Sequence, residues 1–485
     1  MTILAPVDLG AIAERVMHEN GFSTALPDDA RKELAALAGK KPDGEGARDL
    51  RSLPWSSIDN QESRDLDQIE VADRVGNGGI RVRVAIADVD SLVPAGSAID
   101  RHAAENTSSV YTGARVFPML PDALSTDATS LDERRARLAV VIEYTVAQDG
   151  TLGQEDVYAS WVQNRAQLVY DDISAWLDAG RAPPPKLASD PVQQEQLRMQ
   201  NEAAERLRKL RHEHGALDFE TIEAHAVRRD GQVVGLEVAK KGSANALIED
   251  FMIAANGVMA RYLEKKGISS IRRVVRSPER WQRIVDLAAQ HGTALPAEPS
   301  SVALSQFLDA QRKASPDTFG DLSLSVVKLM GPGEYALEKA GVEHIGHFGL
   351  AVHDYTHSTA PNRRYADLVT QRLVKAALHG QPVAYDDVAL AAIAQRCTQK
   401  ENDARKVERV MRKVLAATLL RDRIGAQFDA IVTGATPKGT FVRLLDPPAE
   451  GRVVRGDKGL DVGDRCRVTL LATEPAKGFI DFARA

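Results

Sequence analysis

The spacing of apolar residues changes along this chain, and these changes limit the folds that it can adopt. From 53 to about 170, short segments such as IRVRVAIADVD alternate apolar and polar residues, which is typical of β-strands. A long charged helix is predicted at about 191–213, further strands at 216–240 and a strongly apolar helix at 244–266. Helical spacing dominates from 276 to about 425, and the last segment, 428–485, returns to β-type alternation. The order of these segments predicts an α+β protein with a helical start and a small β-domain at the end.

The composition is that of a globular protein with more than one domain. The chain has 485 residues, of which 44% are hydrophobic and 27% are charged. Cys397 and Cys466 are the only cysteines, which excludes a disulfide scaffold and a cysteine-rich zinc site. No uncharged apolar run approaches the length of a membrane span, and the N-terminus MTILAPVDLG lacks a basic-then-apolar leader, so we expect a soluble, cytoplasmic protein with no membrane partner. The net charge of −6 argues weakly against a polybasic binder but permits a nucleic-acid enzyme with a local basic channel.

Residues 1–50 are predicted to form a small helical region. LGAIAERVMHENGF has apolar positions at helical spacing, and Pro27 starts a second helix, DDARKELAALAGK. The polar, Gly-rich segment KPDGEGARD at 41–49 is typical of a linker. Two helices with a turn fit a helix-turn-helix about as well as they fit a packing appendage.

Three aspartates lie within nine residues at the start of the first β-rich region, in the segment IDNQESRDLDQ. Asp59, Asp65 and Asp67 resemble a carboxylate group for a hard cation, because Mg²⁺ prefers oxygen ligands. Asp65 and Asp67 would project to the same side of an extended segment. The alternative interpretation is a solvated acidic loop, since short Asp patterns recur by chance.

A second candidate is the segment DYTHSTAPNRRYADLV, where Arg363 and Arg364 stand at the start of a predicted helix. A helix N-terminus offers free N–H groups and a positive dipole end, and arginine adds forked donors that match phosphate oxygens. The alternative is a capping turn with surface arginines. Three aromatic residues in polar loops, Tyr111, Tyr170 and Phe219, are more often core residues than base-stacking platforms unless their context indicates otherwise.

These segments occur together and in a fixed order, and in this the chain resembles the ribonuclease II/ribonuclease R family of exoribonucleases. The matching stretches, which cover about 53–420, are IDNQESRDLDQ, VAIADVDSLVPAGSAID, SVYTGARVFPMLP, LVYDDISAWL, GALDFE, LIEDFMIAAN, HFGL and YTHSTAPNRRYADLV. The resemblance implies an RNB catalytic domain at 51–425 after the helical region 1–50. It also implies an OB-fold RNA-binding domain of the ribosomal-protein S-one type at 426–485.

The resemblance assigns the acidic loop and one arginine to the chemistry. Asp59, Asp65 and Asp67 fall on the family's metal-binding aspartates, and Arg363 falls on the arginine that stabilises the scissile phosphate. The family uses Mg²⁺, with Mn²⁺ as an alternative, to activate water for an in-line attack. The implied activity is a processive 3′-to-5′ exoribonuclease that acts on single-stranded RNA or 3′ overhangs and releases 5′-monophosphate nucleotides.

Aromatic residues are implied to hold the RNA. Tyr111 and Phe219 fall on the aromatic pair that clamps the stacked nucleotides at the 3′ end. Tyr170 matches a tyrosine that influences how the final bases are held. Phe441 and Phe479 are candidate stacking groups in the C-terminal domain.

Polar positions complete the implied RNA contacts. Glu249 lies in the motif whose acidic residues contact ribose and favour RNA over DNA, a part that the neighbouring Asp250 could share. Arg364 is the basic position beside Arg363, and Glu408 matches the glutamate that presses on the terminal base. The implied partner is single-stranded RNA, and we expect a monomer with no obligatory protein partner.

Two departures from the family pattern stand out. The family usually carries a second aspartate directly after the position of Asp67, whereas this chain has Gln68, which cannot act as a base or add negative charge. Family members also commonly carry two N-terminal cold-shock-type OB folds, which about 50 helical residues cannot hold. A catalytically weakened RNA-binding regulator with the same fold is therefore the main alternative. A metal-dependent DNA nuclease or phosphatase fits the aspartates alone.

Overall fold

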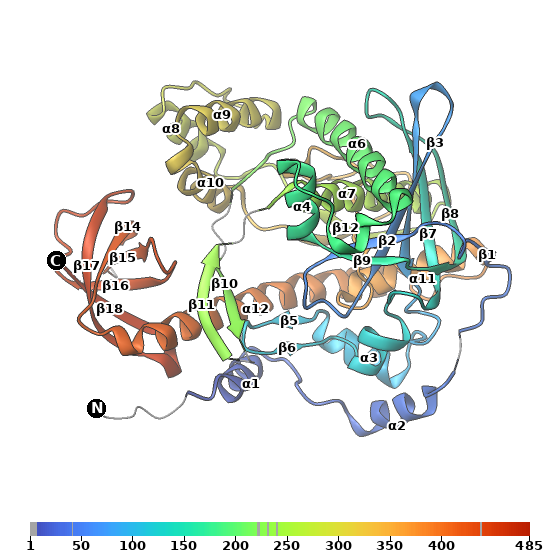
Figure 1. The fold of residues 1–485 in the computed structure, drawn as a ribbon, viewed down its shortest axis with the longest axis horizontal. Coiled ribbons are helices and arrows are strands. Elements are labelled where there is room, and N and C mark those ends of the chain that lie inside the picture. The colour runs from blue at the N-terminus through green and yellow to red at the C-terminus, as the bar shows by residue number, and fades with distance from the viewer. Residues whose placement is uncertain (1–6, 41, 221–223, 230–231, 239–240, 437–438) are drawn as a thin grey trace.

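The computed structural model describes residues 7–40, 42–220, 224–229, 232–238, 241–436 and 439–485. Its largest element is a seven-stranded sheet with the strand order β1-β8-β7-β4-β3-β2-β9 (Figure 1). Strands β2, β3, β4, β7 and β8 pair antiparallel in that sheet, and β1 and β9 join its two edges in parallel. The strands are Arg48–Asp49 (β1), Ser56–Asp59 (β2), Gln68–Arg74 (β3), Ile80–Ala87 (β4), Ala136–Val146 (β7), Leu152–Gln163 (β8) and Ala166–Val169 (β9).

Three helices pack on this sheet and on one another: α4 (Tyr170–Ala179), α6 (Pro191–Glu213) and α7 (Ser243–Lys265). Helix α7 is apolar on nearly all sides and is accordingly buried along most of its length. The helices predicted at about 191–213 and at 244–266 are therefore confirmed. Of the strands predicted at 216–240, the segments Ala224–Arg229 (β10) and Gln232–Val238 (β11) are confirmed and pair antiparallel. Residues 216–220 are not in a strand, and the other positions lie outside the described residues.

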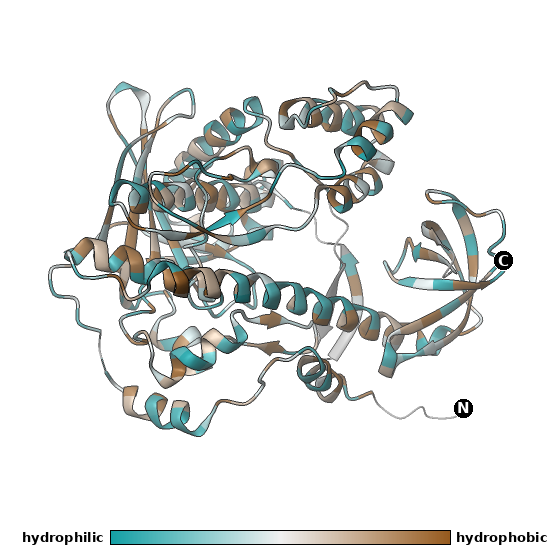
Figure 2. Ribbon diagram, turned by 180° about the vertical axis from the view of Figure 1, so that it is seen from behind, coloured by the Kyte–Doolittle hydropathy of each residue, from teal (hydrophilic) through white to brown (hydrophobic). Residues whose placement is uncertain are grey.

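The longest helix, α12 (Asp387–Leu420), connects the two ends of the molecule (Figure 1). Its 34 residues correspond to about 50 Å at a rise of about 1.5 Å per residue. It follows α11 (Tyr365–His379) and packs against β13 (Glu334–Glu338), the N-terminal helix α1 and the C-terminal barrel. Hydrophilic and hydrophobic turns alternate along it (Figure 2), which fits a helix that is covered on one face only.

The region from 276 to 425 is less purely helical than its sequence pattern predicts. It contains the helices α8 (Trp281–Gln290), α9 (Ser301–Ala314) and α10 (Pro316–Met330), which share a small hydrophobic core. Strand β13 then pairs with β12 (Ser270–Val274) in an antiparallel ribbon. A five-residue strand whose partner lies about sixty residues away leaves little periodic signal, so the helical prediction missed it.

The N-terminal helices lie on different parts of the molecule. Helix α1 (Leu9–Glu19) packs on α12 and on the hairpin formed by β5 (Val110–Tyr111) and β6 (Val116–Phe117). Helix α2 (Asp28–Leu37) packs on α3 (Ala98–Asn106). A short helix, α5 (Pro185–Ala188), precedes α6. Across the described ranges we find no helix that combines the length and the apolar character needed to cross a membrane.

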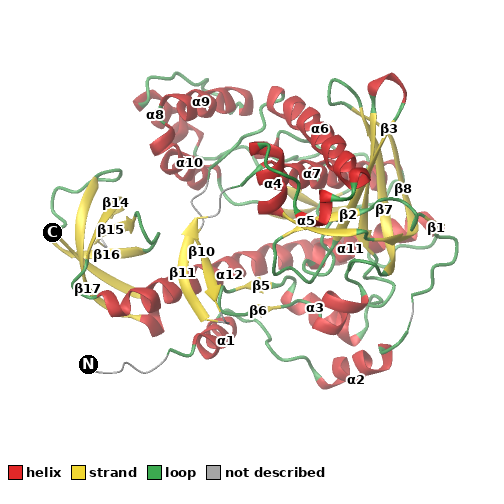
Figure 3. Cartoon of the chain, in the orientation of Figure 1, coloured by secondary structure: helices red, strands yellow, loops and turns green. Residues whose placement is uncertain are grey.

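The chain ends in a closed five-stranded barrel with the order β14-β15-β16-β18-β17. Figure 3 shows this barrel as strands at the opposite end of the molecule from the large sheet. Its strands are Gln427–Thr436, Gly439–Leu444, Glu450–Arg455, Arg465–Glu474 and Phe479–Arg484, from β14 to β18 in chain order. The end of α12 closes its core through Ala416, Ala417 and Leu420. Closure leaves the barrel without free strand edges.

Candidate functional site

The loop between β2 and β3 brings the three predicted aspartates to one end of the sheet. Asp59 is the last residue of β2, and Asp67 directly precedes β3. Their exposed fractions are 8% and 2%, whereas Asp65 in the loop is partly buried. The backbone carbonyl of Asp67 accepts a hydrogen bond of 2.9 Å from the N–H of Ala87 at the end of β4. The sheet therefore fixes both ends of the loop.

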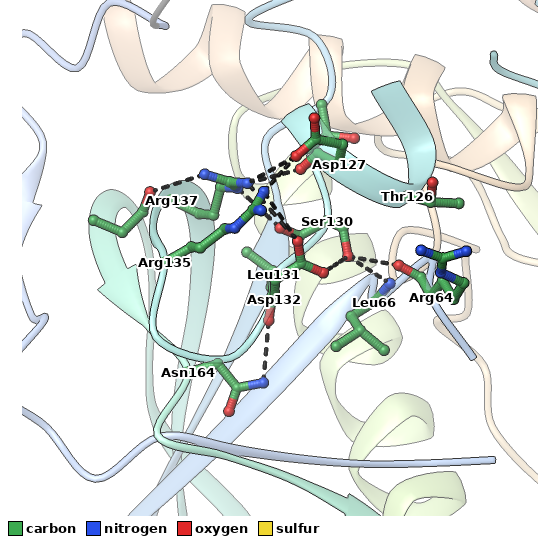
Figure 4. Close-up of polar contacts among 12 residues, drawn as sticks. Arg64, Leu66, Thr126, Asp127, Ser130, Leu131, Asp132, Arg135, Arg137 and Asn164 are labelled. Atoms are coloured by element: carbon green, nitrogen blue, oxygen red, sulfur yellow. Dashed lines mark hydrogen bonds and ion pairs between the residues drawn. The ribbon is translucent and has the colours of Figure 1, made fainter. Parts of the chain in front are cut away.

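Ser130, which lies outside this loop in the sequence, makes hydrogen bonds to the middle of the loop (Figure 4). Its Oγ accepts a hydrogen bond of 3.1 Å from the backbone N–H of Leu66 and lies 2.8 Å from both the carbonyl of Arg64 and a carboxylate oxygen of Asp132. The N–H of Leu131 donates to the carbonyl of Leu66 at 3.0 Å. Since these contacts flank Asp65 on both sides, Ser130 orients the loop that carries the aspartates.

We expect Ser130→Ala to lower the free energy of unfolding by roughly 1–3 kcal/mol, because the Leu66 N–H loses its acceptor. Denaturant titration measures this change. Ser125→Ala is the matched control, since Ser125 is also buried but its Oγ makes only long contacts of 3.4 and 3.5 Å. Equal losses in the two variants would contradict the assigned role of Ser130.

The turn before α11 brings Arg363 to the aspartates. The N–H of Asn362 donates to Oδ1 of Asp67 at 3.0 Å, and Nε of Arg363 donates to Oδ2 of the same carboxylate at 3.2 Å. The Arg363 side chain is 41% exposed, so part of its guanidinium is open to a ligand. Thr129 donates to the Asn362 side chain at 2.6 Å, which ties this turn to the segment before Ser130.

Arg364 points elsewhere. Its Nε and Nη2 donate to the two carboxylate oxygens of Asp367 at 2.8 and 2.7 Å, in a forked ion pair. Burial alone would lower the pKa of the guanidinium, but the Asp367 carboxylate raises it above its usual value. The structure thus gives Arg364 a partner within the fold at the start of α11.

The buried aspartates have unusual electrostatics. Burial raises the pKa of Asp59 to about 6, and the charge of Asp65 adds to this, whereas the Ser57 hydroxyl and Arg363 lower it. Burial likewise raises the pKa of Asp67 to about 7 against the lowering effects of Arg363 and of the Asn362 N–H. Oδ2 of Asp59 is buried and has no hydrogen-bond partner among the described residues.

This donor set fits a hard divalent cation. Mg²⁺ and Mn²⁺ prefer carboxylate oxygens as ligands, and Oδ2 of Asp59 is such an oxygen, buried and without a hydrogen-bond partner among the described residues. Within the part of the chain that is described, no three His, Cys, Asp or Glu side chains form a complete metal-binding group. That is compatible with a Mg²⁺ site, which commonly uses one or two carboxylates with water and substrate phosphate.

Two of the predicted aromatic residues lie beside the aspartates. The hydroxyl of Tyr111, on β5, donates to Oδ2 of Asp65 at 3.2 Å, and the side chain remains 43% exposed. Tyr170 begins α4 directly after Val169, whose register partner across β2–β9 is Asp59. Burial raises the pKa of the Tyr170 phenol, and the nearby charge of Asp59 raises it further.

The remaining predicted residues lie on other elements. Phe219 follows α6 and packs, partly buried, against the core of α8–α10. Glu249 is exposed on α7 and lies 3.4 Å from the amine of Lys241, and Glu408 is partly buried on α12. Asp250, the neighbour of Glu249, is buried and pairs with Arg208 and Arg211 of α6, so it joins two helices and does not face the same way as Glu249.

The site also contains residues that the sequence analysis did not identify. Ser130, Thr129 and the Asn362 N–H position the catalytic candidates through contacts that link distant segments, for which a single sequence gives no signal. Glu70 on β3 is 1% exposed, and its Oε1 has no hydrogen-bond partner among the described residues.

Known proteins share this architecture. The RNase R of Mycoplasma genitalium in complex with ribose-methylated single-stranded RNA superposes with a TM-score of 0.87 at 21% identity, covering 99% of this chain and 78% of that one. Yeast Ssd1, described as a pseudonuclease, superposes with a TM-score of 0.72 at 18% identity, covering 92% of this chain and 56% of that one. The fold is therefore shared by proteins with different described activities.

Sequence relatives and family models agree with the fold. Ribonuclease R of Thermotoga maritima is 28% identical over 98% of this chain and 70% of its own length, and that of Escherichia coli is 29% identical over 88% and 54%. The chain spans about half the length of several curated relatives that it matches, including ribonuclease R 1 of Lactococcus lactis, at 54%. The model of the RNase II-type exonuclease C-terminal S1 domain matches residues 426–485, and the RNB domain model matches residues 47–380. The chain belongs to the RNB-domain family of ribonucleases II and R.

Proposed function

We propose that this chain is a metal-dependent 3′-to-5′ exoribonuclease that degrades single-stranded RNA or 3′ overhangs to 5′-monophosphate nucleotides. The observation that carries the proposal is the convergence of the buried Asp59 and Asp67 with Arg363 at one end of the sheet, beside Tyr111. A protein that only binds RNA has no need for a buried carboxylate oxygen without a hydrogen-bond partner, such as Oδ2 of Asp59. Membership of the RNB family supports the same conclusion.

Each residue has a distinct proposed task. Asp59, Asp65 and Asp67 would hold Mg²⁺, or Mn²⁺ in its place. When bound, the cation would supply charge neutralisation at the scissile phosphate and activation of the attacking water. Asp67 orients Arg363 through Nε, so that the exposed part of the guanidinium can contact the phosphate oxygens on which charge develops.

Aromatic and acidic side chains are proposed to hold the RNA strand. Tyr111 and Phe219 stack on bases at about 1–3 kcal/mol per base without reading their sequence. A stack of bases held between two rings keeps the rings apart. This fits the positions of Tyr111 and Phe219 on different elements of the fold. Tyr170, Glu249 and Glu408 contact the last nucleotides.

In this proposal each region of the chain has its own role. Residues 51–425 form the catalytic domain, and the barrel at 426–485 binds RNA, with Phe441 and Phe479 exposed on its surface. Arg443 of the barrel pairs with Asp321 of α10 at 3.0 Å, which supports the barrel beside the catalytic domain. Residues 1–50 support the hairpin that carries Tyr111, because α1 shares a core with Val110 and Phe117.

The alternative candidate is an RNA-binding protein with weak or absent turnover. Gln68 favours it, since an amide adds no charge to the cation site. The fold itself does not decide between the two, because a pseudonuclease shares it.

The deciding experiment uses a 5′-labelled RNA duplex with a 3′ single-stranded tail, incubated with the protein in Mg²⁺ and separately in EDTA. We expect a metal-dependent ladder that shortens from the 3′ end and no cleavage of DNA of the same sequence. RNA that stays intact in Mg²⁺ and in Mn²⁺ but shifts on a native gel would contradict the exonuclease and establish the binding protein.

We also expect the stabilisation of the protein by Mg²⁺ to grow between about pH 5 and pH 8. Without the cation, folded Asp59 and Asp67 keep protons to pH values of about 6 and 7, whereas the unfolded chain loses them near pH 4. Their burial therefore lowers the free energy of unfolding as the pH rises through this range. Mg²⁺ needs the ionised carboxylates, so its affinity gains roughly tenfold per pH unit for each proton displaced.

Thermal unfolding with and without Mg²⁺ at several pH values measures this effect. An increase in melting temperature that is the same at about pH 5.5 and pH 8 would show that the cation does not bind these two aspartates.

A further inference from the structure

The exposed side chains in the middle of α12 are all basic. From residue 401 to residue 414, the exposed positions are Arg405, Lys406, Arg409, Arg412 and Lys413, which we call the basic stripe. Of the nine residues from 405 to 413, five are arginine or lysine and one is acidic, whereas the whole chain has a net charge of −6. The stripe is therefore a local concentration of positive charge on an acidic protein.

The residues of the basic stripe share one side of the helix. They follow Arg405 at distances of one, four, seven and eight residues, which keeps them together at 3.6 residues per turn. At a rise of about 1.5 Å per residue, the stripe is about 12 Å long. The other side of the same turns is buried in the core shared with α1 and includes Val407, Met411 and Val414. The fold thus uses one side of α12 for packing and leaves the basic side to solvent.

Three members of the stripe have no acidic partner in the fold. Within the described ranges, no ion pair includes Arg409, Arg412 or Lys413. Arg409 and Lys413 are four residues apart, and like charges at this spacing destabilise a helix. A row of unpaired charges that costs stability and fills no gap in the core points to a ligand of opposite charge.

The other two members are only partly neutralised. Arg405 lies 2.6 Å from Glu401, but both carboxylate oxygens of Glu401 also accept hydrogen bonds from Arg273, at 2.6 and 2.9 Å. One carboxylate therefore serves two guanidinium groups. Lys406 pairs with Asp403 at 2.8 Å, and its side chain is still half exposed.

The stripe lies between two regions to which the proposed function assigns RNA. Arg405 is three residues before Glu408 and Arg412 is four residues after it, so both are its neighbours on the helix surface. One turn beyond Arg412, Ala416 and Ala417 are buried in the core of the barrel. Hydrophilic turns of α12 are visible from behind (Figure 2). The stripe therefore leads along α12 from the barrel to the predicted contact with the terminal base.

The composition of the stripe fits a phosphate backbone better than a protein or a membrane. None of the exposed residues from 401 to 414 is aromatic or aliphatic. Protein interfaces depend on apolar and aromatic anchors, and helices that bind membranes expose an apolar side. Arginine and lysine alone are sufficient to bind phosphates, whatever the base sequence.

We propose that the basic stripe binds the phosphate backbone of RNA between the barrel and the catalytic domain. This inference rests on the proposed function, which supplies RNA as the polyanion. The stripe adds a contact that is independent of base sequence and that only a strand long enough to extend beyond the site of the aspartates can reach. A long strand then gains affinity because its second contact is intramolecular.

The test measures RNA binding to the full-length protein in EDTA, by fluorescence anisotropy at several salt concentrations. The variant Arg409→Gln/Arg412→Gln/Lys413→Gln removes the three unpaired charges at exposed positions, and thermal unfolding verifies that it folds. We expect its affinity for a single-stranded RNA of about thirty nucleotides to fall at least about tenfold at about 0.1 M salt. The slope of log affinity against log salt should become shallower by about two, since each phosphate contact on a single strand contributes about 0.7.

Two further variants separate the stripe from the overall charge. Lys32→Gln/Lys40→Gln/Lys209→Gln removes the same charge from exposed positions on other parts of the fold and should bind RNA like the unchanged protein. Arg409→Lys/Arg412→Lys keeps the charge and should stay within about threefold of the unchanged affinity. Equal losses in the lysine control and in the stripe variant would overturn the inference. A folded stripe variant with unchanged affinity and salt slope would also overturn it, and would leave an acidic protein as the partner of the stripe.

The two proposals fail in different ways. Weaker and less salt-dependent RNA binding by the stripe variant, in a protein that cleaves no RNA, would support the stripe and overturn the proposed function. Unchanged RNA binding by the stripe variant, in a protein that degrades RNA from its 3′ end, would overturn the stripe and leave the exonuclease in place.

Discussion

Replacement of Asp67 by asparagine is expected to slow RNA hydrolysis by at least about a thousandfold while RNA binding is retained. The carboxylate of Asp67 is 2% exposed and accepts hydrogen bonds from both the Asn362 N–H and Arg363 Nε. Asparagine can keep the first bond through its carbonyl oxygen, but it adds no negative charge for the cation and presents an N–H₂ group toward Arg363. The variant therefore loses a metal ligand and the orientation of Arg363 together.

Single-turnover cleavage of a 5′-labelled RNA measures the chemical step, and fluorescence anisotropy in EDTA measures binding. Asp73→Asn is the matched control, because Asp73 lies on β3, the strand that follows Asp67, and pairs with Arg83 on the sheet, away from the loop of aspartates. Its turnover should stay close to that of the unchanged protein. Cleavage by Asp67→Asn at a comparable rate would remove Asp67 from the catalytic set.

The sequence predicted those parts of the site that are encoded in short segments. Asp59, Asp65 and Asp67 lie within nine residues, so one loop brings them to the same end of the sheet. Arg363 was recognisable because it stands at a helix start after Pro361. Local chemistry and local geometry agree at these positions, and a motif of few residues is enough to indicate them.

The residues that position this chemistry could not be predicted in the same way. Ser130 contacts Leu66 from 64 positions along the chain, and Asn362 contacts Asp67 from 295 positions away. Such contacts exist only after the sheet and α11 have been placed.

The sequence alone does not distinguish the roles of the adjacent residues Arg363 and Arg364. Both follow Asn362 in the sequence, and both fit phosphate equally well as isolated side chains. The backbone is extended at Arg364, the residue directly before α11, and the side chains of Arg363 and Arg364 have different partners. Arg363 reaches Asp67 and stays 41% exposed, whereas Arg364 pairs with Asp367. The same residue type thus supplies a candidate catalytic group and a helix-start ion pair.

Because Arg363 is the arginine that remains open to a ligand, Arg363→Ala is expected to lower the maximal rate of RNA hydrolysis by about a hundredfold to a thousandfold. The loss belongs to the rate and not to the Michaelis constant, because the guanidinium contacts charge that develops only during the reaction. Arg363→Lys should recover little, since an ammonium group cannot both hold Asp67 and present a forked pair of donors. Steady-state kinetics on a short single-stranded RNA separate the two constants.

The Arg364→Ala variant is the comparison for Arg363→Ala, and we expect it to lose stability. Removing the forked partner of Asp367, which is fully buried, leaves that carboxylate without its counter-charge and should lower the free energy of unfolding by about 3 kcal/mol or more. Arg363→Ala should cost less stability, because Asp67 takes up a proton readily once the arginine is gone. Thermal unfolding measures the stability of the two variants, and Arg364→Ala should have the lower melting temperature. A stable Arg364→Ala protein with a rate as low as that of Arg363→Ala would mean that both arginines act on the phosphate, and that the ion pair with Asp367 opens when RNA binds.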